Sequence, residues 1–188
     1  MTAFPRDDVV ARGRRAVVRR KRLADAVDEY RWRSDAELAR FDASRPVQAP
    51  FENFARNWSF DYRFTDVAGR SFAIDDEHGQ HIGNVMYYNL NTERGEAEIG
   101  ISIGERSHWS RGYGSDALEA AVRRVFGGSS LTRLVLHTLD WNDRAQKCFQ
   151  KVGFEVSGTS WRDGNTFIVM EVFREWVESQ ARVRAAVA

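Results

Sequence analysis

The sequence predicts an α/β protein in which helices pack on one mixed β-sheet. The chain has 188 residues, 43% hydrophobic and 29% charged, which is typical of one domain with a sizeable core. Strand-like runs joined by short turns fill its middle, and helical and strand-like patterns alternate after them. We therefore expect residues 1–188 to form a single domain, with residues 1–15 flexible and residues 174–188 forming a C-terminal helix.

The composition argues against several classes of protein. A net charge of +1 creates no field that would attract nucleic acid or a membrane surface. The one cysteine, Cys148, rules out an internal disulfide, and the four histidines lack zinc-site spacing. No apolar run approaches the roughly 20 residues of a membrane span, and the N-terminus lacks the apolar core of a signal peptide. We expect a cytoplasmic protein that uses no metal.

The N-terminal third predicts one strand and three helices. A strand over residues 16–19 lies inside the basic run 12–22. We favour this strand over a nucleic-acid-binding arm, because the run contains no aromatic residue and the rest of the chain balances its charge. Residues 23–41 predict two helices that meet near Ser34, a credible N-cap with Glu37 at the capping-box position. Prolines then interrupt the pattern, and residues 51–58 predict a further short helix.

The rest of the chain predicts strands and helices in alternation. Three antiparallel strands follow residue 71, with turns at residues 77–80 and 91–95. A helix begins at Gly112, where apolar residues recur with helical spacing. A strand over residues 131–139, a helix that stops at Gly153 and a hairpin around residues 163–164 complete the expected sheet.

The glycine turn before the residue-112 helix is suited to an anion. Gly112 and Gly114 stand in "SRGYGSDA", where backbone N–H groups lie at the positive end of the helix dipole. The turn is not a P-loop, because the chain has no GxxxxGK[ST]. A dinucleotide fingerprint, GxGxxA, is present, but eight residues separate the preceding strand from Gly112. A plain helix cap is the third alternative for this stretch alone.

Two motifs together resemble the GNAT acetyltransferase superfamily, in particular its RimJ/RimL-like branch. The first is "WSRGYG" (residues 109–114), and the second is Asn142, Ala145, Phe149, Gly153 and Phe154. The resemblance is close over residues 97–158. It implies a central, mostly antiparallel sheet that splays between its fourth and fifth strands, with helices on both faces. It also implies acetyl-CoA as cosubstrate, with its pyrophosphate at the glycine turn.

The resemblance implies that the following residues form the acetyl-CoA site: Ile101, Ser102, Ile103, Trp109, Ser110, Arg111, Gly112, Tyr113, Gly114, Ser115, Asn142, Ala145 and Phe149. Strand backbone at residues 101–103 can pair with the pantetheine amides as another strand would. Phe149 departs from the family, which commonly has at this position a tyrosine that protonates the leaving thiolate. Another group or water must then supply that proton, or the thiolate leaves unaided.

An amine acceptor must lose a proton before it attacks, since a free primary amine has a pKa near ~10. Strand alternation places Glu96, Glu98 and Ser102 on one face and Ala97 with Ile99 on the other. We expect Glu98 to be the base, directly or through water. Glu96 is the alternative, and a merely solvated or paired Glu98 stays open.

The acceptor site is expected between the N-terminal helices and the last hairpin. Its candidates are Trp32, Asp35, Tyr88 and Trp161, since aromatic and acidic side chains suit a cationic amine, although such aromatics are also common in cores. The expected function is acetyl transfer from acetyl-CoA to a primary amine of a small molecule or peptide: a protein N-terminus, a polyamine, an amino sugar or an antibiotic. The alternative is a non-catalytic acyl-CoA-binding or sensor protein. A homodimer is one arrangement that the C-terminal helix would allow.

Overall fold

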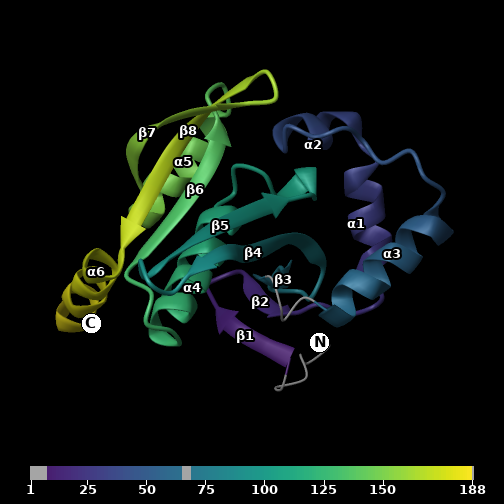
Figure 1. The fold of residues 1–188 in the computed structure, drawn as a ribbon. Helices are drawn as coiled ribbons and strands as arrows, with labels where there is room; N and C mark the ends of the chain where they lie inside the picture. The colour runs from purple at the N-terminus through teal and green to yellow at the C-terminus, as the bar shows by residue number, and fades with distance from the viewer. Residues whose placement is uncertain (1–7, 65–68, 188) are drawn as a thin grey trace.

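The computed structural model describes residues 8–64 and 69–187, and their strands form one eight-stranded sheet (Figure 1). The strand order is β1-β2-β3-β4-β5-β6-β8-β7. All neighbouring strands are antiparallel except β5 and β6, which are parallel. The strands are β1 (Val9–Arg12), β2 (Val17–Arg20), β3 (Gly69–Asp75), β4 (His81–Asn91), β5 (Glu96–Ile103), β6 (Arg133–Leu139), β7 (Glu155–Arg162) and β8 (Asn165–Phe173). The predicted mixed, mostly antiparallel sheet is confirmed.

Six α-helices connect these strands in the described ranges. They are α1 (Asp25–Arg33), α2 (Ala36–Phe41), α3 (Phe51–Phe64), α4 (Tyr113–Gly127), α5 (Asp143–Val152) and α6 (Arg174–Val187). The expected N-cap at Ser34 is wrong by one residue: Asp35 caps α2, and its carboxylate accepts the backbone N–H groups of Glu37 and Leu38. Over the part of the chain that the structure describes, no helix has the length and apolarity of a membrane span.

Strand β1 lies in the segment that was expected to be flexible. Val9–Arg12 pairs with β2, and the turn between the two strands is fixed from outside by Asp116 in the first turn of α4. The Asp116 carboxylate accepts the backbone N–H groups of Arg14, Arg15 and Ala16, each at 2.8 Å. A strand of four residues gives little periodic signal, so this long-range anchor could not be predicted locally. Residues 1–7 lie outside the described ranges.

The sheet opens between β5 and β6. Their parallel pairing covers only Glu96–Glu98 opposite Arg133–Val135, whereas β6 stays paired with β8 as far as Leu139. Beyond Glu98 the edge of β5 that faces β6 is therefore unpaired, as Figure 1 shows where the two ribbons diverge. Counted without β1, these are the fourth and fifth strands, so the predicted splay is confirmed.

The two faces of the sheet have different partners. Ile99, Leu134 and Leu136 belong to the buried core that the sheet shares with α4 and α5, and each is at most 2% exposed. On the other face α1 packs against the sheet, and its Trp32 ring lies 4.8 Å from the ring of His81 in β4. Helices thus cover both faces, and the split between β5 and β6 joins the two sides.

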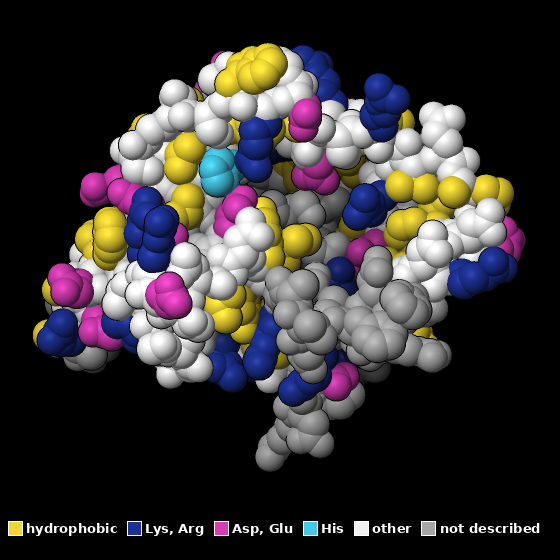
Figure 2. Space-filling model, viewed as in Figure 1, with side chains coloured by type: hydrophobic (Ala, Val, Ile, Leu, Met, Phe, Trp, Pro, Cys, Tyr) yellow, Lys and Arg dark blue, Asp and Glu magenta, His cyan; other side chains and the backbone are white. Residues whose placement is uncertain are grey.

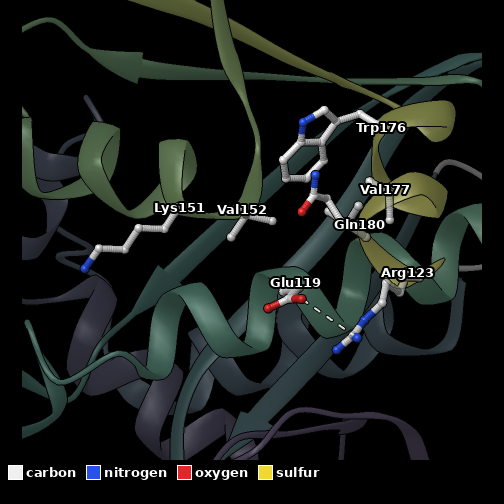
Figure 3. A pocket seen from close by; sticks show the side chains of 9 residues that line it. Glu119, Arg123, Lys151, Val152, Trp176, Val177 and Gln180 are labelled. Atoms are coloured by element: carbon white, nitrogen blue, oxygen red, sulfur yellow. Dashed lines mark ion pairs between the residues drawn. The ribbon is translucent and has the colours of Figure 1, made fainter. Parts of the chain in front are cut away.

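The C-terminal helix α6 packs beside α4 and α5 (Figure 3). Trp176 lies against Gly153, whose left-handed backbone (φ 98°) ends α5 as the sequence predicted. Side chains from the three helices, including Val152, Trp176 and Val177, enclose a pocket of about 20 Å³. That is room for about one water molecule, so this pocket is a packing defect and not a ligand site.

Candidate active site

A cleft of about 1140 Å³ runs through the split between β5 and β6. Its walls come from α1, α2, the ends of β4–β6, the starts of α4 and α5, and the β7–β8 turn. Figure 2 shows the molecule hollowed between the strands β6–β8 and the helices α1 and α2, with charged side chains and a histidine around the opening. A cleft of this volume is large enough for an extended ligand.

One end of the cleft is the start of α4. Gly112 caps this helix with a left-handed backbone (φ 89°), a conformation that glycine adopts without cost. The first N–H groups of a helix have no acceptor within it, so those of the first turn of α4 are available to an anion. Gly114 and Ser115 also line the cleft, and a Cβ on Gly114 would lie 3.4 Å from Sγ of Cys148. The glycine turn therefore leaves room for a phosphate against the backbone.

Most of the predicted cofactor residues line this part of the cleft: Ile101, Ser102, Ile103, Trp109, Ser110, Gly112, Gly114, Ser115, Asn142, Ala145 and Phe149. Arg111 and Tyr113 do not. The Arg111 side chain donates to the carbonyl of Ser107 (3.2 Å), and the Tyr113 hydroxyl donates to Glu77 (2.7 Å) on the far side of α4. The side chains of these two residues therefore contact protein groups outside the cleft lining and stabilise the glycine turn.

An aromatic and cationic cluster closes the cleft above β5. The Trp109 indole N–H donates to the Ile103 carbonyl at 2.7 Å, and the Arg144 guanidinium lies 3.6 Å above the Trp109 ring. Phe41 of α2 packs edge-on against Trp109, with ring centroids 5.7 Å apart. Burial lowers the pKa of Arg144, and the charge of Glu37 acts in the opposite direction. Neither the role of Phe41 nor that of Arg144 was predicted, because their contacts with Trp109 join segments about 70 and 35 residues apart.

The start of α5 forms the neighbouring wall. Asn142 caps this helix, since its side-chain oxygen accepts the Ala145 N–H at 3.3 Å. Phe149 is 6% exposed, lines the cleft and packs near Phe154. Cys148 also lines the cleft, and burial raises the pKa of its thiol to about 11. The wall beside the split is thus apolar and carries no phenol at position 149.

Glu98 lies at the split itself and is held by three donors. Its Oε1 accepts the Tyr88 hydroxyl at 2.8 Å and lies 2.9 Å from Nδ1 of His137, and its Oε2 accepts the Asn89 amide at 3.0 Å. Burial works to raise the pKa of Glu98, but these hydrogen bonds and the electrostatic interaction with His137 lower it overall. Burial and the bond to Glu98 raise the pKa of Tyr88, so the phenol remains a donor. Glu98 is therefore an ionised carboxylate in the cleft wall.

Glu96, the alternative base, lies outside the cleft lining. Its Oε2 accepts a guanidinium N–H of Arg133 at 2.9 Å, and its Oε1 is 3.8 Å from Arg94. The predicted strand alternation is confirmed, because Ala97 and Ile99 are buried while Glu96 and Glu98 emerge on the opposite face. Only one of the two carboxylates reaches the cleft.

The predicted acceptor residues divide into two pairs. Trp32 and Tyr88 line the cleft. Asp35 instead caps α2 and pairs with Arg106 at 2.7 Å, and Trp161 is 73% exposed on the outer part of the hairpin. The β7–β8 hairpin lines the cleft with Arg162 and Asp163, and Asp42, the C-cap residue of α2, also lines it. Burial raises the pKa of Asp42, and the charge of Arg33 acts in the opposite direction. These residues lie near chain reversals, where sequence patterns do not define the direction of a side chain.

The fold and the site define a class of protein: one that binds an extended, phosphate-bearing cosubstrate across a split sheet. The chain belongs to the GNAT acetyltransferase family, because the model of the acetyltransferase (GNAT) domain matches residues 15–155. The predicted acetyltransferase class is thereby confirmed.

Individual relatives agree with this assignment. The chain is 25% identical over 149 residues to the uncharacterized N-acetyltransferase p20 of Bacillus licheniformis, covering 77% of this chain and 81% of that protein. Spermidine N-acetyltransferase from Vibrio cholerae, solved with CoA and spermine, superposes with a TM-score of 0.75 at 18% identity, covering 86% of this chain and 97% of that one. The aminoglycoside acetyltransferase AAC(6')-Ib, solved with coenzyme A, gives 0.73 at 19% identity, covering 89% and 99%.

Proposed function

We propose that this protein transfers the acetyl group of acetyl-CoA to a primary amine by direct attack within a ternary complex. The observation that carries the proposal is the cleft through the β5–β6 split. At one end it has a helix start suited to a pyrophosphate, and at the split it has the ionised Glu98. The two substrates would enter from opposite faces of the sheet and meet where the strands separate.

The cofactor end fits acetyl-CoA on the residues present. The first turn of α4 offers backbone N–H groups to a pyrophosphate, and the β5 edge beyond Glu98 offers unpaired backbone groups to the amides of a pantetheine arm. Phe149 and Ala145 supply an apolar wall beside the arm. Structures of the same fold have been solved with CoA and with acetyl-CoA.

The acceptor end supports a small-molecule amine. The structural relatives named above are a spermidine N-acetyltransferase and an aminoglycoside acetyltransferase, and both kinds of acceptor carry several amino groups, including primary amines. Two acidic side chains of this cleft, Asp42 and Asp163, suit an ammonium group, whereas Glu29 is already paired with Lys21 at 2.7 Å and Arg33 and Arg162 lie in the same lining. Because both signs of charge are present, an acceptor with several positive charges is less well matched than a compact amine.

A second candidate is a protein that binds acyl-CoA without transferring the acyl group. Phe149 favours it, because a phenyl ring cannot donate a proton to the leaving thiolate. In this case the start of α4 and the edge of β5 would still bind the acyl-CoA, but no acyl transfer would take place at the β5–β6 split.

The test is a screen for acetyl-CoA consumption over spermidine, kanamycin, benzylamine and a peptide with a free N-terminus. Each acceptor is paired with detection of free CoA and with a mass measurement of the product. We expect a mass increase of one acetyl group on at least one amine. Acetyl-CoA binding by calorimetry without any acetylated amine would instead favour the binding protein, and absence of acetyl-CoA binding would contradict both.

A further inference from the structure

His137 occupies a position at the split that the strand register defines. The last β5–β6 pair joins Glu98 to Val135, and His137 is two residues further along β6, on the same face as Val135. The residues between and beside them, Leu134 and Leu136, point into the core and are at most 2% exposed. The imidazole therefore emerges on the acceptor side, where the two strands have just separated, and it lines the cleft.

One nitrogen of this imidazole is bound to Glu98 and the other is not. Nδ1 lies 2.9 Å from Oε1 of the Glu98 carboxylate. An ionised carboxylate can only accept, so Nδ1 carries the proton of this bond and the neutral ring has its lone pair on Nε2. No other described residue hydrogen-bonds to Nε2, and the side chain is 21% exposed. Nε2 is thus an acceptor that has no partner among the described residues, on a side chain that lines the cleft.

Glu98 has the geometry of an orienting group and not that of a base. Both of its oxygens already accept hydrogen bonds, and its pKa is lowered. Tyr88 and Asn89 are adjacent in β4, and adjacent strand residues ordinarily point to opposite faces. A β-bulge after Tyr88 and a left-handed Asn89 (φ 52°) bring both side chains onto the same carboxylate. A carboxylate held in this way resists protonation and aligns the ring that it binds.

We propose that Nε2 of His137 takes the proton from the acceptor amine and that Glu98 is the positioning residue that holds its ring. The inference rests on the proposed function, since it assigns one step of that reaction. The ammonium group gives one proton to Nε2, and the neutral nitrogen forms a C–N bond to the acetyl carbonyl carbon while the C–S bond breaks. The electron pair of that bond leaves with the sulfur, which receives the second proton of the nitrogen. His137 then returns its proton to solvent.

Other ionisable groups also lie near Glu98 and His137. Tyr88 faces Glu98 from β4, and Arg162 at the end of β7 acts on Tyr88 and lines the cleft. Asp163 follows Arg162 in the same lining. From β8, Glu171 lies opposite Val135 on the same face, and its carboxylate is paired with Arg133. Among these groups, only the His137 ring can present an unprotonated nitrogen lone pair to the cleft.

The test compares the rates of His137→Ala, Glu98→Gln and wild-type protein with spermidine, kanamycin or benzylamine, from pH 6 to 10. His78→Ala, in the exposed β3–β4 turn, is the matched control. We expect His137→Ala to lower kcat/KM about a hundredfold at pH 7, the range for loss of a general base, with acetyl-CoA binding unchanged. The loss should shrink to about tenfold or less at pH 10, where much of the amine is already neutral. Added imidazole should restore part of the rate to His137→Ala and none to Glu98→Gln.

Equal rates for His137→Ala and wild type would overturn the inference while leaving the proposed function intact. So would a loss that is the same at pH 7 and pH 10 and that imidazole does not rescue, because it would mean that His137 acts only on structure. A wild-type protein that acetylates none of the amines in the screen would overturn the proposed function, and this assignment with it. Thermal unfolding of each variant separates these outcomes from loss of the fold.

Discussion

The two ends of the cleft are constructed in different ways. The cofactor end is made by two short stretches of chain: residues 101–115, which run from the end of β5 into α4, and residues 142–149, which form the start of α5. The acceptor end takes its side chains from α1, α2, β4, β6 and the β7–β8 turn. A phosphate site formed by backbone N–H groups needs only a local conformation, whereas a site formed by side chains needs several distant elements to meet. The first can therefore be recognised as a motif, and the second varies with the packing of the elements around it.

The largest expected effect concerns Cys148, which lies in the apolar wall of the cofactor end. Burial raises the pKa of its thiol to about 11, so at pH 8 the thiolate fraction, and with it the alkylation rate, should be about a hundredfold below that of an ordinary cysteine. Because the folded-state pKa is raised, the rate with iodoacetamide should increase with pH up to about 11. Mass spectrometry of native and urea-unfolded protein provides the comparison. Equal rates in the two states at pH 8 would show that this wall is open to solvent.

Gly112→Ala should weaken acetyl-CoA binding about tenfold. The left-handed conformation of residue 112 costs an alanine about 1–2 kcal/mol, so the turn in this variant would relax to another conformation. Binding of acetyl-CoA would then have to return the turn to the left-handed conformation, which lowers the affinity. Gly164→Ala is the matched control: it has the same sign of φ (79°) and open space around it, but lies in the β7–β8 turn. Calorimetry should find wild-type affinity for the control. Similar losses in both variants would mean that general strain, and not the turn before α4, is responsible.

On the acceptor side, Asp42→Asn should raise the KM of a cationic amine about fivefold without changing the affinity for acetyl-CoA. The Asp42 carboxylate lines the cleft, where loss of a charge contact with an ammonium costs about 1 kcal/mol. Asp35→Asn is the matched control, since Asp35 lies outside the lining and asparagine also caps helices. Steady-state kinetics check both variants. A larger KM change in the control would indicate that the acceptor binds near the start of α2 instead.

The smallest expected effect is a gain. Phe149→Tyr should raise kcat about threefold, because a phenol at this position can protonate the leaving thiolate. The measurement is free CoA release at saturating substrates, with Phe154→Tyr as a control in the buried core, where a hydroxyl reaches no cleft. An unchanged kcat for Phe149→Tyr would mean that water or another group already supplies the proton.

How far the site could be predicted depends on the kind of contact. Gly112, Asn142 and Phe149 were identified because two motifs place them at helix starts and on one helix face, and all three line the cleft. Asp35 and Trp161 were chosen for their chemistry alone, and the structure places both outside the lining. His137 was missed because a single histidine in a strand carries no signal. Only the strand register shows that it faces Glu98.

The sequence by itself determined the order of strands and helices that follow β1, the helix start at Gly112 and the faces of β5, since these follow from hydrophobic periodicity and from backbone preferences within a few residues. Tertiary structure alone decided that β1 joins the sheet, that Asp116 anchors its turn, and that Glu98 is bound by Tyr88, Asn89 and His137. These contacts depend on which distant segments pair and where that pairing ends. The β5–β6 pairing ends at Glu98, and the register at that point places a carboxylate and an imidazole together in the cleft.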